Sequence, residues 1–300
     1  MNKLRLVSAA LLSAMAVTGP ALAADMPLPP PPVAIPVCIW CGWYVGVNGG
    51  YNWGTADVTF TPTGSFSQDL NTPFFAANGS TSLHPRKFSG GGQIGWNSQW
   101  GPMVAGIEAD GEYIGLRATR STPLLTAPVL LGPPLNSPAE EISFDENIKN
   151  DWVTTLRLRL GWTNDYALIY ATGGIALSQH KFSQTFTIQN FNGGVLQQGE
   201  TLTVTGGGSV TKFVGGFAGG GGAEFKLTSD WSLRAEYLFV DLGKADFDGT
   251  LVCTSGCTSS TMPVGFTTHH QERMWTNIVR GAINYQFPVA APVVEPVIVK

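Results

Sequence analysis

Eight stretches of this chain alternate apolar residues with small or polar ones at the two-residue period of a β-strand, and none carries a charge on its apolar phase. In the stretch 43–53, the odd positions hold Trp, Val, Gly and Tyr, whereas the even positions hold Tyr, Gly and Asn. Each stretch has about the 9–11 residues with which a tilted strand crosses a bilayer. We therefore predict strands with lipid on one face at residues 43–53, 88–96, 103–113, 152–162, 167–177, 217–227, 231–239 and 279–287.

The opposite phase of the same stretches collects five acids and five bases. Isolated charges inside a narrow barrel would be too costly, so we predict a network of salt bridges that fills the lumen. An alternative is a metal site or a hydrolytic carboxylate pair at Glu108, Asp110 and Glu112, which share one strand face. The predicted lumen network comprises Glu108, Asp110, Glu112, Arg157, Arg159, Glu224, Lys226, Arg234, Glu236 and Arg280.

Composition excludes a helical membrane protein. Charged residues are 13% of the chain, against about 25% in ordinary soluble proteins. The mean hydropathy is only +0.09. No apolar run after the N-terminus approaches the ~18 residues of a membrane helix. A β-barrel remains compatible with these values, because its signal in each strand is weak.

The N-terminus has the three parts of a secretory signal peptide at residues 1–23. Lys3 and Arg5 precede an apolar core at 6–17, and Ala21-Leu22-Ala23 forms a small-residue cleavage site. Cleavage would leave 15 bases against 21 acids, which argues against nucleic acid as a partner. We predict a Sec-exported protein.

The connections between the predicted strands alternate in length. Residues 97–102, 163–166 and 228–230 are short, whereas 54–87, 114–151, 178–216 and 240–278 are long and rich in Gly, Ser, Thr, Asn and Pro. Bacterial outer-membrane barrels combine short periplasmic turns with long extracellular loops. The predicted fold class is therefore all-β, an eight-stranded antiparallel transmembrane β-barrel with four long extracellular loops, short periplasmic turns and both termini in the periplasm.

Aromatic residues mark both ends of the predicted strands, as expected of side chains that favour the lipid–water boundary. The predicted girdles include Trp43, Trp53, Trp96, Trp152, Trp162, Trp231, Tyr285 and Phe287. Proline-rich segments flank the barrel, so we divide the chain into a signal peptide (1–23), a periplasmic linker (24–42), the barrel (43–287) and a C-terminal tail (288–300).

Four cysteines occur as two close pairs, which suits an oxidising compartment. For Cys38 and Cys41 we expect a structural disulfide or an idle pair, since no helix follows to lower a thiol pKa. A zinc site is a weaker alternative, because no histidine lies at ligand spacing. We expect Cys253 and Cys257 to close a loop.

Several segments resemble the outer-membrane immunogenic-protein family of alphaproteobacteria, which are small porin-like surface barrels. The resemblance covers essentially residues 43–287 and is most specific in the first strand, in the hairpin 223–237 and in the last strand, Arg280-Gly281-Ala282-Ile283-Asn284-Tyr285-Gln286-Phe287. It implies an outer-membrane location and recognition of Phe287 by the barrel-assembly machinery. This chain departs from the family by continuing to Lys300.

The sequence favours a structural or surface-interaction role over catalysis. The histidines, His84, His180, His269 and His270, fall in or beside the predicted loops, without Ser or Asp partners at a catalytic spacing. We predict no enzyme activity and no cofactor, and we expect outer-membrane lipid, lipopolysaccharide and loop ligands as partners. Two alternatives remain. One is a narrow porin for small solutes. The other is a surface protein that binds haem or metal at His269 and His270, as the resemblance implies.

Overall fold

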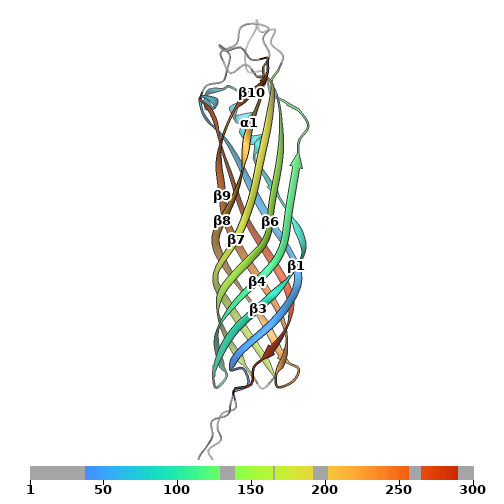
Figure 1. Cartoon of the computed structure of the whole chain (residues 1–300), viewed down its shortest axis with the longest axis vertical. Helices are drawn as coiled ribbons and strands as arrows, with labels where there is room; N and C mark the ends of the chain where they lie inside the picture. The colour runs from blue at the N-terminus through green and yellow to red at the C-terminus, as the bar shows by residue number, and fades with distance from the viewer. Residues whose placement is uncertain (1–37, 129–138, 165, 192–201, 257–264, 290–300) are drawn as a thin grey trace, which may run out of the picture. The chain divides into compact units, whose positions relative to one another are not determined.

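Eight long strands form a closed ring in the computed structural model, which describes residues 38–128, 139–164, 166–191, 202–256 and 265–289 (Figure 1). Each strand pairs antiparallel with two neighbours, in the order β1, β3, β4, β6, β7, β8, β9 and β11, and β11 pairs again with β1. The prediction of eight antiparallel strands in a ring is confirmed. The predicted signal peptide, residues 24–37 of the linker and residues 290–300 of the tail lie outside the described residues.

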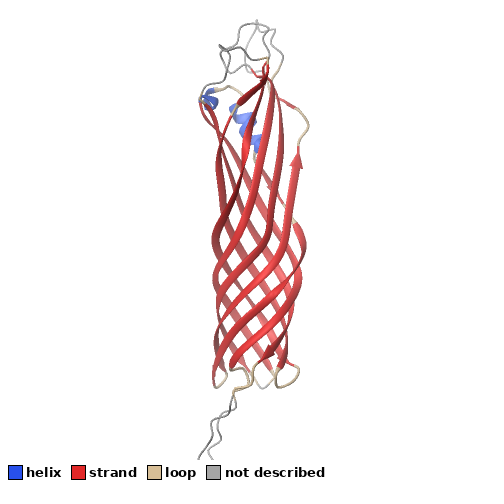
Figure 2. Ribbon diagram, viewed as in Figure 1, coloured by secondary structure: helices blue, strands red, loops and turns tan. Residues whose placement is uncertain are grey.

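The ring strands are β1 (Gly42–Gly64), β3 (Arg86–Trp100), β4 (Met103–Ser121), β6 (Glu141–Thr163), β7 (Ala167–Phe191), β8 (Leu202–Lys226), β9 (Trp231–Thr250) and β11 (Phe266–Gln286). The minor elements are η1 (Ser65–Gln68), α1 (Thr72–Gly79), β2 (Thr81–Leu83), β5 (Leu125–Thr126) and β10 (Val252–Ser255). Neither helix in the described part of the chain is long and apolar enough to cross a membrane. The tight connections gather at one end of the ring, the turn end, and α1 and β10 lie at the other, the loop end (Figures 1 and 2).

The prediction of four long loops was wrong over much of their length, because the strands run far beyond the bilayer-sized stretches. β7 has 25 residues and β6 has 23. In the segment 55–61 of β1, for example, Thr55, Asp57 and Thr59 alternate with buried Ala56, Val58 and Phe60. The alternation therefore continues past Trp53 with its two faces exchanged, and a backbone that alternates in this way stays in the sheet.

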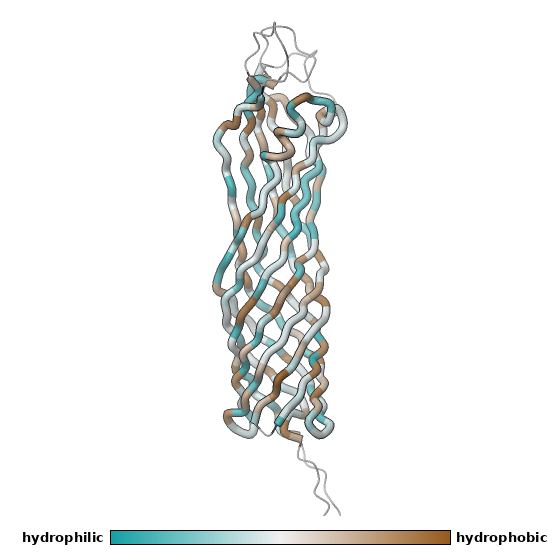
Figure 3. Tube along the Cα trace, turned by 180° about the vertical axis from the view of Figure 1, so that it is seen from behind, coloured by the Kyte–Doolittle hydropathy of each residue, from teal (hydrophilic) through white to brown (hydrophobic). Residues whose placement is uncertain are grey.

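The wall of the barrel consequently has two zones. Towards the turn end, the outer surface is an apolar belt that includes Val47, Ile94, Leu158, Ile169 and Ile283, all exposed. Towards the loop end, the outer surface carries Thr, Ser, Asn, Asp and Lys, and apolar side chains point inward. The alternation of apolar and polar residues along the strands can be followed in Figure 3.

Irregular pairings lie where the two zones meet. The register shifts between Tyr113 and Leu116 of β4 and between Asn150 and Val153 of β6. Gly115, at the first of these shifts, has φ of +53°, a left-handed conformation that glycine adopts without strain. An extra residue on one strand can exchange its inward and outward positions. Across the β6 shift the buried positions change from odd-numbered Val153 to even-numbered Asn150 and Ile148, whereas in β4 they stay even-numbered, at Glu112 and Leu116. The β6 bulge therefore exchanges the two faces of that strand, while in β4 the sequence pattern itself changes phase.

Candidate functional site

The lumen is the part of the molecule where charged side chains gather, and it is filled in successive layers. The first layer, at the turn end, is the segment before β1. Trp40 is 1% exposed and packs with Val104, Leu168 and Tyr170 inside the barrel mouth. Its backbone N–H donates to Gln99 Oε1 at 3.0 Å. Part of the predicted linker therefore closes the barrel rather than leading away from it.

A disulfide joins Cys38 to Cys41 around this tryptophan. The side-chain amide of Gln286 on β11 donates to the carbonyl oxygens of Ile39 and Cys41, at 3.2 and 2.5 Å. Cys253 is also disulfide-bonded, while Cys257 lies outside the described residues. Lys226 stands beside the same plug, with Nζ 4.9 Å from the centroid of the Trp40 ring.

The second layer is an ion-pair network of four arginines and five carboxylates, all almost fully buried. Arg157 is its centre: Nη2 lies 2.6 Å from Glu108 and 2.5 Å from Asp110, and Nη1 lies 3.2 Å from Glu236. Arg280 contacts Glu236 at 2.5 Å, Glu112 at 2.8 Å and Asp110 at 3.1 Å. Planar guanidinium groups suit this role, because each offers several donors in fixed directions.

Arg234 links the two sides of the network, at 2.5 Å from Glu108 and 3.2 Å from Glu224. Arg159 also pairs with Glu224, and its guanidinium carbon lies 3.7 Å from the centroid of the Tyr170 ring. The hydroxyl groups of Tyr44 and Tyr170 donate to Glu108 and Glu236, at 2.5 and 2.8 Å. These neutral donors satisfy carboxylate oxygens where carboxylates outnumber arginines.

Nine of the ten predicted lumen residues lie in this layer, and Lys226 does not. Its ammonium is half-buried at the turn-end mouth and donates to Gln286 and to the carbonyl of Ser229, at 2.5 and 3.2 Å. Its flexible stem reaches the rim, where an amide oxygen and a backbone carbonyl oxygen take the place of an ion partner. The alternative hypothesis was a metal site at Glu108, Asp110 and Glu112. Each of these three carboxylates instead forms an ion pair with an arginine.

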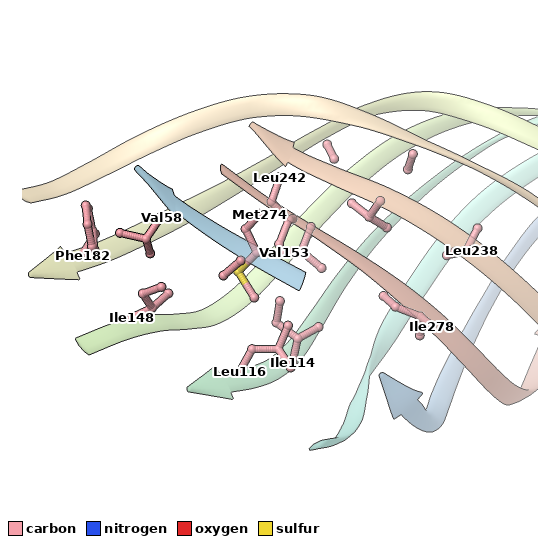
Figure 4. Close-up of a cluster of buried hydrophobic side chains, with 14 residues drawn as sticks. Val58, Ile114, Leu116, Ile148, Val153, Phe182, Leu238, Leu242, Met274 and Ile278 are labelled. Carbon is pink, nitrogen blue, oxygen red and sulfur yellow. The ribbon is translucent and has the colours of Figure 1, made fainter. Parts of the chain in front are cut away.

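The third layer is apolar and lies above the ion pairs, near the change of zone (Figure 4). Val58, Ile114, Val153, Leu238 and Met274 are among its buried members, and they come from β1, β4, β6, β9 and β11. Aliphatic side chains from strands all around the ring therefore meet in the lumen. Such a layer excludes water where an ion-conducting path would need it.

The fourth layer is a polar group that sequence reasoning missed. His180 on β7 lies 2.7 Å from Glu272 on β11. Gln184 links His270 to Glu146, at 2.7 Å in each case. The residues sit on inward positions of strand segments that the sequence analysis assigned to loops. The inverted alternation around them is the signal that could have found them.

The fifth layer closes the loop end with phenylalanines and the short helix α1. Phe60, Phe144 and Phe186 form edge and tilted ring contacts with centroids 5.0–6.0 Å apart. Gly79 at the end of α1 meets these rings, since a Cβ there would lie 2.6 Å from Phe60 and 2.7 Å from Phe144. The Gln184 side chain also donates to the Gly79 carbonyl at 2.7 Å. The helix is thus held inside the mouth by packing and by hydrogen bonds.

The predicted haem or metal pair at His269 and His270 does not form. The two residues are consecutive on β11, so their side chains point to opposite faces of the wall. His270 is buried in the lumen, whereas His269 faces outward and lies 2.8 Å from Asp248. The expectation that the histidines belong to loops was also wrong for His180, His269 and His270, which lie on β7 and β11.

His270 lies on the part of β11 that extends beyond the apolar belt, and it supports a pH-dependent prediction. Burial, and next the neighbouring His269, lower the pKa of His270 from 6.5 to about 4. The unfolded chain therefore takes up the proton first as the pH falls. The contribution of His270 to the free energy of unfolding should be fully present above about pH 6.5 and should be lost as the pH falls towards 4, a decrease of roughly 3 kcal/mol.

Urea unfolding at several pH values checks this prediction, with His270→Gln as the comparison. Glu146 contributes a pH dependence of the opposite sign, because burial raises its pKa. Since both proteins contain Glu146, the difference between their stabilities at each pH gives the contribution of His270 alone. The variant should lose the decline between pH 6.5 and 4. An identical pH dependence in both proteins would show that His270 does not remain neutral in the fold.

The predicted girdle residues lie at the two edges of the apolar belt. At the turn end, Trp43 pairs in register with Trp96, and Trp231 with Tyr285. Tyr285 and Phe287 make an edge contact at 5.4 Å. At the other edge, Trp53 is exposed, and Trp152 stacks obliquely on Phe213 at 5.9 Å. Trp162 is exposed on β6 at the turn end.

A closed ring with an apolar outer belt, aromatic edges and a lumen packed with side chains defines a transmembrane β-barrel protein. The chain belongs to the outer membrane protein β-barrel domain family, whose model matches residues 9–287. The family resemblance and the outer-membrane location predicted from the sequence are thereby confirmed.

The 31 kDa outer-membrane immunogenic protein of Brucella melitensis is 31% identical over 241 residues, covering 78% of this chain and 86% of that protein. The 22 kDa outer membrane protein of Rhizobium leguminosarum bv. viciae is 27% identical over 217 residues, covering 71% and 69%. Among solved structures, OprG from Pseudomonas aeruginosa aligns at a TM-score of 0.39 and 11% identity, covering 82% of this chain and 97% of that one.

Proposed function

We propose that this protein is a closed barrel of the outer membrane, whose role is structural and whose interactions take place on its outer wall and at its loop end. The observation that carries the proposal is the sequence of layers in the lumen. Ion pairs, aliphatic residues, a polar group and phenylalanines follow one another between the Trp40 plug and α1. Eight strands leave an interior that side chains can fill.

A non-enzymatic role belongs to the same proposal. A catalytic carboxylate must be accessible to its substrate, whereas the five acids of the network are almost fully buried and each contacts an arginine. The part of the wall beyond the apolar belt offers a polar, exposed surface instead. This surface would project from the membrane and would be available to partners outside the cell.

Conductance in a planar lipid bilayer tests the closed lumen. The wild-type protein should give no steady single-channel currents, because a hydrated ion would have to cross two apolar layers. Arg157→Glu should lower the stability of the barrel without opening a path, since Val58, Ile114 and Met274 would still block the lumen. Large, steady currents from the wild type would refute the proposal and favour a narrow porin.

A further inference from the structure

Three bases lie in a row across the outer wall, immediately beyond the apolar belt. Arg117 on β4 is directly opposite Lys149 on β6, and Lys149 is directly opposite Lys181 on β7. Like charges opposite each other destabilise a sheet. Their juxtaposition therefore calls for a compensating group.

Neighbouring acids neutralise the positive charge of this row only in part. Asp151 lies 3.0 Å from Lys149 and 3.6 Å from Arg117, so one carboxylate serves two bases. Among the residues that the structure describes, Lys181 makes no direct ion pair, and the charge of the same Asp151 acts on it from farther away. On the next strand, Lys212 pairs with Asp246 at 3.2 Å. The row of Arg117, Lys149 and Lys181 thus retains an excess of positive charge.

An apolar hollow of about 350 Å³ lies on the same side of the wall, at the edge of the belt that is nearer the loop end. It is lined by Trp152, Thr154, Leu177, Phe213, Val214 and Gly215, from β6, β7 and β8. Lys149 precedes Trp152 by three residues and Lys181 follows Leu177 by four. At ~3.3 Å per residue, the charged row stands about 10–13 Å beyond the hollow.

This arrangement matches a lipid whose acyl chain lies in the bilayer and whose charged group lies at its surface. Neighbouring strands are about 4.8 Å apart, so the three bases span roughly 10 Å. That width suits two phosphate groups on one sugar backbone better than the single phosphate of a phospholipid. Arginine and lysine bind phosphate oxygens strongly, and Arg can do so with two hydrogen bonds.

We propose that this surface is a binding site for one molecule of an acylated, diphosphorylated glycolipid of the outer leaflet, the lipid A type. The phosphates would lie on Arg117, Lys149 and Lys181, and an acyl chain would occupy the hollow between Trp152, Leu177 and Phe213. The site rests on the proposed orientation, in which the loop end faces outward. It does not depend on whether the lumen conducts.

Native mass spectrometry of the full-length mature protein in zwitterionic detergent tests the site. The probes are diphosphoryl lipid A, the same lipid without phosphates, and inorganic phosphate. Wild type should bind one diphosphoryl lipid A and should bind the dephosphorylated lipid at least tenfold more weakly. Each of Arg117→Gln, Lys149→Gln and Lys181→Gln should weaken binding about fivefold. Inorganic phosphate alone should not bind measurably.

Two further variants provide the controls. Gly215→Leu should fill the hollow without disturbing the wall, because a Cβ at Gly215 would meet only Leu177, at an ordinary 3.8 Å. It should weaken binding while leaving all charges in place. Lys244→Gln removes an exposed base from β9, two strands from β7 in the ring, and should leave binding unchanged. Heat-modifiable migration on a detergent gel verifies that each variant is folded.

The proposal is overturned if the triple variant of Arg117, Lys149 and Lys181 binds diphosphoryl lipid A as tightly as wild type. It is equally overturned if Lys244→Gln weakens binding as much as Lys181→Gln does, because the attraction would then be nonspecific. Since no readout here depends on conductance, a failure of the lipid site would leave the closed lumen intact, and the reverse also holds.

Discussion

Arg280→Met should destabilise the barrel by about 3–5 kcal/mol, because removal of one partner leaves buried charges without compensation. The guanidinium of Arg280 lies within 3.1 Å of three carboxylates, those of Asp110, Glu112 and Glu236, and every member of this group is at most 1% exposed. Methionine fills much of the volume but neutralises none of the acids. The free energy of unfolding in urea, measured on refolded protein in lipid vesicles, checks the result.

Arg273→Met is a matched control on the same strand. Its guanidinium lies 2.8 Å from Asp241, at a distance like those of Arg280, but its side chain is 50% exposed. Water can therefore solvate Asp241 once the arginine is removed, and the loss should be much smaller than that caused by Arg280→Met. Equal losses for the two variants would mean that the lumen network is well hydrated and does not act as a packed layer.

A double variant adds a direct test of the pairing. Glu236→Gln in the Arg280→Met background removes one of the three acids that lose Arg280 as a partner, and it should recover part of the lost stability. The recovery measures coupling between the two residues, as in a double-mutant cycle. No recovery would mean that Glu236 is held by Arg157 alone, to which it lies at 3.2 Å.

Leu158→Arg should cost about 2–4 kcal/mol, the penalty for a base near the middle of the lipid-facing surface. Leu158 is 66% exposed on the outer face of β6, and its register partners are Ile107 on β4 and Gly173 on β7. The guanidinium would have to reach the bilayer surface or draw water into the hydrocarbon. Vesicle refolding yield and the free energy of unfolding both report the effect.

Asn147→Arg is the control for the lipid face. Asn147 is exposed on the outer face of the same strand, but it lies beyond the apolar belt. An arginine there would enter water, so the change should remain within about 0.5 kcal/mol. A penalty at Asn147 as large as that at Leu158 would place the membrane boundary higher on the wall than the apolar belt indicates.

The Arg280 and Leu158 variants probe the inner and the outer face of the same part of the barrel wall. In the belt, lipid outside requires apolar residues, so the charged residues face inward and must neutralise one another. Beyond the belt, water outside accepts Lys, Asp and Thr, and the interior can take Val, Ile and Phe. Side chains therefore fill the lumen in both zones. They are mainly charged within the belt and mainly apolar beyond it.

The sequence by itself determined the class of the protein. An uncharged alternating phase in eight stretches, together with short and long connections in turn, required strands with one lipid-facing side. The inward position of Glu108, Arg157 and Arg280 followed from the same alternation, because the period of a strand is two. The local periodicity of each stretch was sufficient for these predictions. They required neither the pairing partners of the strands nor the order of the strands in the ring.

The full extent of the strands is encoded in the sequence, but a lipid-facing pattern does not reveal it. Thr55, Asp57 and Thr59 continue the alternation of β1 with the opposite face apolar. Judged by a lipid-facing pattern alone, this segment looks like a polar loop. In β6 the bulge at Asn150–Val153 further conceals the change, because Ile148 and Leu156 are both even-numbered, yet Ile148 is buried in the lumen and Leu156 is exposed on the outer face.

Only the tertiary structure decided which charges meet. Arg280 and Glu112 are 168 positions apart in the chain, and Arg157 reaches carboxylates on two different strands, β4 and β9. The closing of the ring sets such distances, and no local pattern encodes them. The same is true of Trp40 in the turn-end mouth, of α1 in the loop-end mouth and of the row of Arg117, Lys149 and Lys181, because each depends on register between strands that the alternation of a single strand does not fix.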